Sequence, residues 1–155
     1  MIRVFLDANV YFAGCYSPTG ASAWMLTLAR QKHVTLVASR LVLREAERNL
    51  RQKSTQRVVG AFRRFLRETK VMMMPTLPDQ VLARYEHAIH PKDVPVLASA
   101  VEAKVDYLLT LDRKHFMTTA ARAAAGRVKI ATPGEFLRLV VRRHLPAPRR
   151  VSTRS

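Results

Sequence analysis

The stretch HPKDVPVLASAVEAKVDYLLTLDRKHF occupies residues 90–116 and combines a helix pattern with a strand pattern. Residues 93–103 carry apolar side chains at helical spacing, with Asp93 at the N-cap and Pro95 in the first turn, where its missing N–H costs little. Residues 105–111, VDYLLTL, then form an apolar run of strand length. We therefore expect a capped helix that leads into a buried strand.

The same alternation begins at the N-terminus. Residues 2–6, IRVFL, have the pattern of a buried strand, and residues 21–32 have that of an amphipathic helix. Residues 34–39, VTLVAS, predict a second strand, and Ser39 is placed to cap a helix over residues 40–50. Strands that alternate with helices are typical of α/β proteins with a parallel sheet.

Residues 54–70 predict a strongly basic amphipathic helix. Its expected apolar stripe consists of Val58, Val59, Phe62 and Leu66, and its basic face of Arg57, Arg64 and Arg67. Residues 71–76, VMMMPT, are too short for a helix and stop at a proline, so we expect an edge strand or an extended connector. We expect its three methionines to fill the core.

The remaining expected elements are helices over residues 77–89, 113–126 and 133–144 and a strand over residues 127–132. Gly126 is placed to end the second of these helices. A chain of 155 residues suits one compact core, and we assign it to residues 1–142. The basic tail, residues 143–155, has no apolar periodicity, and we expect it to be disordered.

The charge balance is unusual. The chain has 27 Lys and Arg against 11 Asp and Glu, a formal net charge of +16, which favours polyanionic partners such as nucleic acid. An anionic membrane surface is the weaker candidate, because no apolar run is long enough to span a bilayer. Cys15 is the only cysteine, so no internal disulfide forms and we expect a cytoplasmic protein.

The few acidic residues include four that lie near the ends of expected strands or at the start of an expected helix. Asp7 and Asp112 each follow an expected central strand, Asp93 begins the helix before the second of these strands, and Glu45 lies within two turns of residue 39. Each aspartate alone is explained by helix capping. In a parallel sheet, however, residues beyond the carboxyl ends of central strands project into one crevice, so the four acids can converge there.

A cluster of ionised carboxylates is costly unless a cation lies between them. Oxygen ligands without a matching set of Cys or His residues suit Mg²⁺ or Mn²⁺. Such ions polarise a phosphodiester and lower the pKa of bound water. We therefore expect Asp7, Asp93 and Asp112 to bind Mg²⁺ or Mn²⁺, with Glu45 assisting the ion or orienting the attacking water.

Four segments in order resemble the PIN-domain nucleases, and most of all the bacterial PIN proteins grouped with the toxin components of toxin–antitoxin pairs. They are LDANV (6–10), LREAERNL (43–50), KDVPVLASAVEAKVDYLLTLDRKHF (92–116) and KIATPGEFL (129–137). The resemblance covers roughly residues 2–140. It implies a three-layer α/β/α domain whose central, mostly parallel sheet has about five strands.

By this resemblance, the four acids match the family's metal-binding residues. In the family these residues bind Mg²⁺ or Mn²⁺ for the cleavage of single-stranded RNA. Asn9 and Thr110 match positions that commonly support the site. Glu47 rivals Glu45, because residues two apart on a helix point about 200° apart and only one faces the crevice. We prefer Glu45, because its distance from Ser39 better fits the family pattern.

Two histidines mark departures from the family pattern. Many relatives have an acid where His90 stands and another near His115, which implies fewer oxygen ligands here and a looser second ion. His115 and Arg113 follow Asp112 closely and are candidates for contact with a substrate phosphate.

The resulting hypothesis is a metal-dependent endoribonuclease that acts on single-stranded or structured RNA as the toxin of a toxin–antitoxin pair. The resemblance implies a cognate antitoxin and self-association into a homodimer as further partners. The alternative is a PIN-like module that binds RNA or protein without cleaving it. A receiver-type phosphoryl-transfer domain is disfavoured, because residues 7–9, DAN, supply only half of the acid pair it needs.

Overall fold

A central sheet organises the computed structural model, which describes residues 1–141. The five strands are β1 (Arg3–Leu6), β2 (Thr35–Ser39), β3 (Met72–Met74), β4 (Tyr107–Leu109) and β5 (Lys129–Ala131). They lie in the order β3-β2-β1-β4-β5, and every neighbouring pair is parallel. Each strand predicted from the sequence is present, and β1 is the central one.

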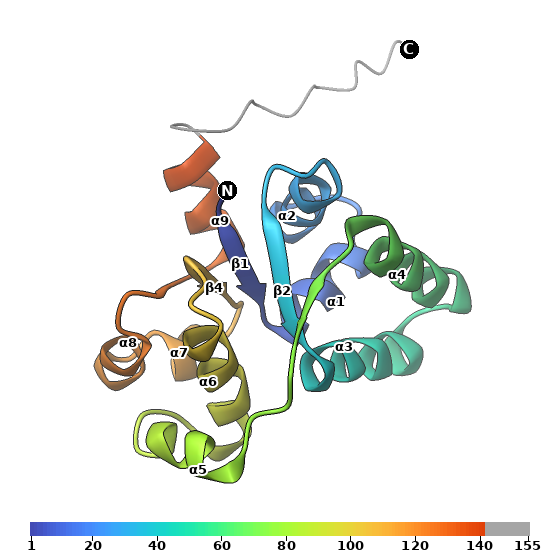
Figure 1. The fold of residues 1–155 in the computed structure, drawn as a ribbon. Coiled ribbons are helices and arrows are strands. Elements are labelled where there is room, and N and C mark those ends of the chain that lie inside the picture. The colour runs from blue at the N-terminus through green and yellow to red at the C-terminus, as the bar shows by residue number, and fades with distance from the viewer. Residues whose placement is uncertain (142–155) are drawn as a thin grey trace.

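Two layers of helices cover the sheet (Figure 1). One layer contains α1 (Ala8–Tyr16), α2 (Ala21–Arg30), α3 (Arg40–Lys53) and α4 (Gln56–Thr69), with α9 (Pro133–Phe136) against α2. The other contains α5 (Asp79–Leu82), α6 (Val94–Glu102), α7 (Arg113–Phe116) and α8 (Thr119–Ala125). The expected three-layer α/β/α fold is confirmed.

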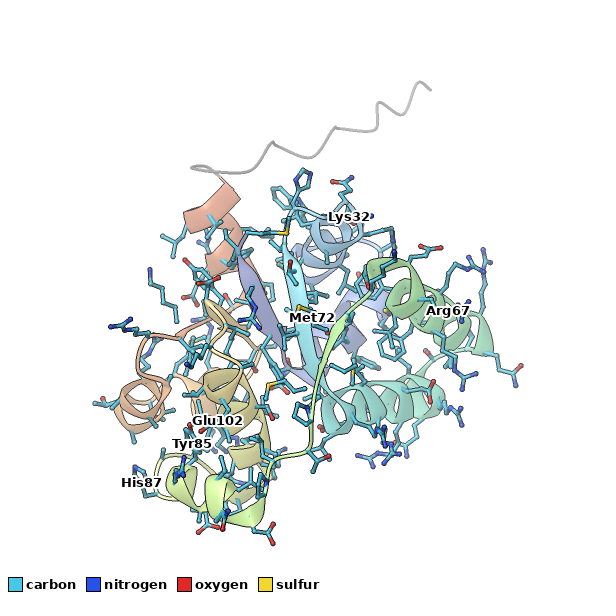
Figure 2. All side chains as sticks on the ribbon, viewed as in Figure 1. Lys32, Arg67, Met72, Tyr85, His87 and Glu102 are labelled. Atoms are coloured by element: carbon cyan, nitrogen blue, oxygen red, sulfur yellow. The ribbon has the colours of Figure 1, made fainter. Side chains whose placement is uncertain are left out.

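The apolar stripe of helix α4 packs against the core. Val59, Phe62 and Phe65 are buried, and the Phe62 ring packs edge-on against Tyr11 of α1 with 5.9 Å between ring centroids. Val58 and Leu66 of the expected stripe are half-buried at its margins. The expected basic face stays in solvent, as Arg67 illustrates in Figure 2.

Three expected helices are shorter or broken. Residues 77–89 form α5, the 3₁₀ helix η1 (Ala83–Tyr85) and turns, so that successive short segments bury Tyr85, Ala88 and Ile89. The Tyr85 hydroxyl donates to Glu102 of α6 at 2.8 Å, a contact between neighbouring elements in Figure 2. This contact holds the broken segment against α6.

The expected helix over residues 113–126 is two helices, because the Thr118 hydroxyl caps a new start by accepting the Ala121 N–H. Gly126 ends the second, with φ at 60°. The last expected helix consists of α9 and a π-helical turn, Leu137–Val141, and its final residues lie outside the described part. So does the basic tail, residues 143–155.

The methionine prediction was wrong for two of the three residues. Met72 and Met73 are 50% and 51% exposed, and only Met74 packs against the core. The physical reason is that β3 is an edge strand, which pairs with β2 alone (Figure 2). Among residues 1–141, no helix has the length and apolar character needed to cross a membrane.

The glycines of α1 and α4 give a matched test of this packing. A Cβ atom at Gly14 lies 2.5 Å from Leu26 Cδ1 of α2 and 3.0 Å from the Ser22 carbonyl oxygen, whereas one at Gly60 meets no atom within 4 Å. We predict that Gly14→Ala lowers the free energy of unfolding by about 1–3 kcal/mol through overpacking. Gly60→Ala is expected to raise it by about 0.5–1 kcal/mol.

Chemical denaturation of the two variants checks this. Equal effects of the two substitutions would contradict the close approach of α1 and α2.

Candidate active site

Asp7 lies where β1 ends and α1 begins. It is 7% exposed, and its Oδ1 atom accepts the Ala8 N–H at 2.8 Å as the N-cap of α1. Its Oδ2 atom accepts the Thr110 hydroxyl at 2.8 Å. Thr110 follows β4, which pairs with β1, so parallel pairing brings both residues to the same edge of the sheet.

Asn9 and Thr110 tie the two strand ends together. The Asn9 side-chain amide donates to Thr110 Oγ1 at 3.3 Å and to Asp7 Oδ2 at 3.4 Å, and its Oδ1 accepts the Leu111 N–H at 3.1 Å. Thr110 Oγ1 also accepts the Asp112 N–H at 3.1 Å. The two residues expected to support the site therefore contact its first acid directly.

Asp93 occupies the N-cap position of α6, but its side chain does not cap the helix. The carboxylate is instead turned inward. The residue is 6% exposed, and its Oδ2 atom has no hydrogen-bond partner among the described residues. The capping explanation for this aspartate is therefore wrong, and its buried oxygen needs another one.

Asp112 caps α7 and holds His115. Its Oδ1 atom accepts the His115 backbone N–H at 3.0 Å, and its Oδ2 atom lies 2.8 Å from His115 Nδ1. The same Nδ1 lies 3.3 Å from Asp93 Oδ2. The His115 ring therefore lies between two carboxylates and stacks on His90, with 5.3 Å between ring centroids.

Burial and mutual repulsion perturb the acids. Burial raises the pKa of Asp7 to about 6, with contributions from the charges of Asp93 and Glu45, against hydrogen bonds from Thr110 and Ala8. The pKa of Asp93 is also raised, chiefly by burial and further by the charge of Asp112. The charge of Asp93 thus acts on Asp7, and the charge of Asp112 acts on Asp93.

Asp112 behaves differently. Burial opposes its ionisation, but the two hydrogen bonds from His115 and the positive charges of His115 and Lys92 outweigh burial and lower its pKa. An acid that stays ionised next to two whose pKa is raised is typical of a cluster with a functional role.

The two glutamates of α3 have different surroundings. Glu47 Oε1 accepts Arg63 Nε of α4 at 2.6 Å and its other oxygen lies 3.4 Å from Arg51, and these contacts lower the pKa of Glu47. The half-buried Glu45 instead lies close enough to Asp7 to raise the pKa of Asp7. Glu47 is thus held by arginines, and the preference for Glu45 as the acidic site residue of α3 stays a prediction.

Arg113 is engaged by an acid that the sequence analysis did not single out. Its Nη1 atom lies 3.1 Å from Glu135 Oε1, whose residue also hydrogen-bonds Thr132 at the start of α9. The spacing of Thr132 and Glu135 is that of a capping box, a signal present in the sequence. The Arg113 side chain is 64% exposed and only its Nη1 atom takes part in this ion pair, so its other N–H groups remain accessible to a substrate.

The donor set fits a divalent cation. Asp93, Asp112 and His115 each offer one ligand atom, and these atoms all lie within 4.8 Å of one another. A buried carboxylate oxygen without a partner is costly, and a bound cation removes that cost.

The raised pKa of Asp7 predicts a specific pH dependence for the metal-free protein. A folded-state pKa above the unfolded value gives a stabilisation that is complete below about pH 4 and is lost as the pH rises through about 6. The rise from 3.8 to about 6 corresponds to on the order of 3 kcal/mol at about 1.4 kcal/mol per unit.

Asp7→Asn cannot ionise, so we expect it to lose less stability than the unsubstituted protein between pH 4 and pH 7. Urea denaturation in EDTA across this range measures the difference. Parallel stability curves for the two proteins would contradict the assigned cost of ionising Asp7.

Known protein structures share the fold of this chain. The VapBC2 structure from Rickettsia felis, bound to a DNA fragment from its promoter, has a TM-score of 0.59 and 13% identity, covering 84% of this chain and 98% of that chain. The FitAcB structure from Neisseria gonorrhoeae has a TM-score of 0.57 and 15% identity, with the same coverage of 84% and 98%. No curated protein matches the sequence.

These structural likenesses show a shared fold. The sequence also matches the family described as PIN domain over residues 3–114, a segment that contains Asp7, Glu45, Asp93 and Asp112. The chain belongs to the PIN domain family.

Proposed function

We propose that this protein is a metal-dependent endoribonuclease that hydrolyses RNA phosphodiester bonds. The observation that carries the proposal is that ligand atoms of Asp93, Asp112 and His115 lie within 4.8 Å of one another, with Asp7 near enough for the Asp93 charge to raise its pKa. One buried Asp93 oxygen has no hydrogen-bond partner within residues 1–141. Membership of the PIN family and the resemblance of the sequence to PIN nucleases support this choice of chemistry.

Each residue has a role in this proposal. Asp7, Asp93 and Asp112 hold Mg²⁺ or Mn²⁺, and Glu45 orients the attacking water. Asn9 and Thr110 fix the Asp7 carboxylate through their hydrogen bonds to its Oδ2 atom. When bound, the ion polarises the phosphodiester and lowers the pKa of water.

The charge on the helices supports a polyanionic substrate. Arg40, Arg44 and Arg48 are exposed on successive turns of α3, the helix that carries Glu45, and form no ion pair among the described residues. Residues four apart on a helix are neighbours on one face. Contacts of this kind to phosphates give affinity without sequence information, which suits an RNA backbone.

We further propose that the chain is the toxin of a toxin–antitoxin pair. The resemblance of the sequence to PIN toxin components and the fold shared with VapBC2 and FitAcB support this assignment. Such a toxin is expected to arrest growth when expressed alone in bacteria, and Asp93→Asn is expected to relieve the arrest. Sustained growth arrest by the Asp93→Asn variant would show that the toxicity does not depend on the acid cluster.

Cleavage of labelled single-stranded RNA by the purified protein with Mg²⁺ or Mn²⁺ tests the nuclease proposal. We predict that EDTA abolishes cleavage and that Asp93→Asn slows it at least about a hundredfold, because the ion loses its most buried ligand.

The matched control is Asp106→Asn. Asp106 flanks the same strand, β4, at the opposite end, where its Oδ2 atom accepts the Arg3 N–H at 2.8 Å. This variant is expected to cleave at the unsubstituted rate. Equal cleavage by the Asp93 variant would indicate a contaminating nuclease, and binding without cleavage would favour the alternative of an RNA-binding module.

A further inference from the structure

We propose that His115 is a metal ligand and that Asp93, Asp112 and His115 form a mixed nitrogen–oxygen site that selects a transition-metal ion over Mg²⁺. This inference rests on the proposed function, because it names the class of ion used at that site. It concerns the one residue of the cluster that the sequence analysis assigned to the substrate.

The position of the imidazole is the first argument. His115 Nδ1 lies 2.8 Å from Asp112 Oδ2 and 3.3 Å from Asp93 Oδ2. Adjacent ligands of an octahedral ion with bonds of about 2.1 Å are roughly 3 Å apart, so His115 Nδ1 already has this spacing from each of the two carboxylate oxygens. No large side-chain movement is needed for all three to reach one ion.

The buried oxygen is the second argument and is independent of the hydrogen bonds within the cluster. Asp93 Oδ2 has no hydrogen-bond partner in the described part of the chain, residues 1–141, although Asp93 is 6% exposed. It lies 3.3 Å from His115 Nδ1 without forming a hydrogen bond to it. Native proteins leave few such groups unsatisfied, and an ion is one of the standard explanations. An ion in contact with Nδ1 is therefore also in reach of this oxygen.

The local sequence explains why the ring is held in place. Asp112 caps α7 and binds the His115 backbone N–H, so the side chain three residues later turns back toward its own cap. His90 stacks on the other side of the ring, and its own Nδ1 accepts the Lys92 N–H at 3.3 Å. His90 therefore positions the His115 ring and uses its Nδ1 elsewhere.

The donor chemistry decides the class of ion. Mg²⁺ prefers oxygen ligands alone, whereas imidazole nitrogen suits transition-metal ions. A neutral imidazole adds a nitrogen donor to the carboxylates without adding charge. The ion takes the place of the Nδ1 proton, and the neutral ring then carries its proton on Nε2.

Pulsed electron paramagnetic resonance of the full-length protein loaded with Mn²⁺ tests this directly. We expect modulation from a ¹⁴N nucleus bonded to Mn²⁺ in the unsubstituted protein. The signal should persist in His90→Gln and disappear in His115→Gln. Circular dichroism of each variant confirms that it is folded.

Calorimetric titration supplies the affinity. His115→Gln is expected to weaken Mn²⁺ binding by about ten- to a hundredfold, the range seen when partners of metal sites are removed, and to change Mg²⁺ binding much less. Equal losses for the two ions would overturn the assigned selectivity.

The outcomes separate this inference from the proposed function. Bound Mn²⁺ without a ¹⁴N signal, or a signal that survives His115→Gln, would overturn the role of His115 while leaving EDTA-sensitive RNA cleavage intact. Failure of both Mn²⁺ and Mg²⁺ to bind would overturn this inference and the proposed function together.

Discussion

The parallel pairing of β1 with β4 is the constraint on which the site depends. Leu6 pairs with Leu109, so Asp7 and Thr110 lie side by side immediately beyond the paired strands. The Asp7 N–H continues the ladder by donating to the Leu109 carbonyl at 2.9 Å, and the Thr110 hydroxyl binds the Asp7 carboxylate. A shift of one residue in this register would turn Asp7 to the other face of the sheet.

The burial of Asp7 and Asp93 lowers the folding stability of the protein when both are ionised. Burial raises the pKa of Asp7 and Asp93, which means that the fold disfavours their ionised forms. The surrounding structure tolerates this cost because the core below the site is continuous, with Phe5, Leu6 and Leu109 fully buried. Strain of this kind is expected where a protein prepares a site for a charged ligand.

Much of the architecture could be predicted from the sequence because the buried strands are short apolar runs and the helix starts carry clear caps. Ser39 caps α3 as expected, and Gly126 ends α8. The failures arose where local chemistry overrode periodicity. Thr118 began a new helix inside an apparently continuous pattern, and the edge position of β3 left Met72 and Met73 exposed.

The candidate site was likewise predictable from the sequence only in part. Strand ends and the rule for parallel sheets sufficed to place Asp7 and Asp112 at the same edge of the sheet, but they do not determine the orientation of single side chains. The sequence predicted both a capping role and a metal-binding role for Asp93, and the side chain makes no capping hydrogen bond. It also could not pair Arg113 with Glu135, since that contact depends on how α7 and α9 pack.

The central claim is that carboxylates from distant segments meet closely enough to bind one divalent ion. Anomalous diffraction from crystals soaked in Mn²⁺ tests it most directly. A strong peak bonded to oxygens of Asp93 and Asp112 beside Asp7 is the predicted result. Ordered, ion-free carboxylates in crystals that bind Mn²⁺ elsewhere would contradict the account.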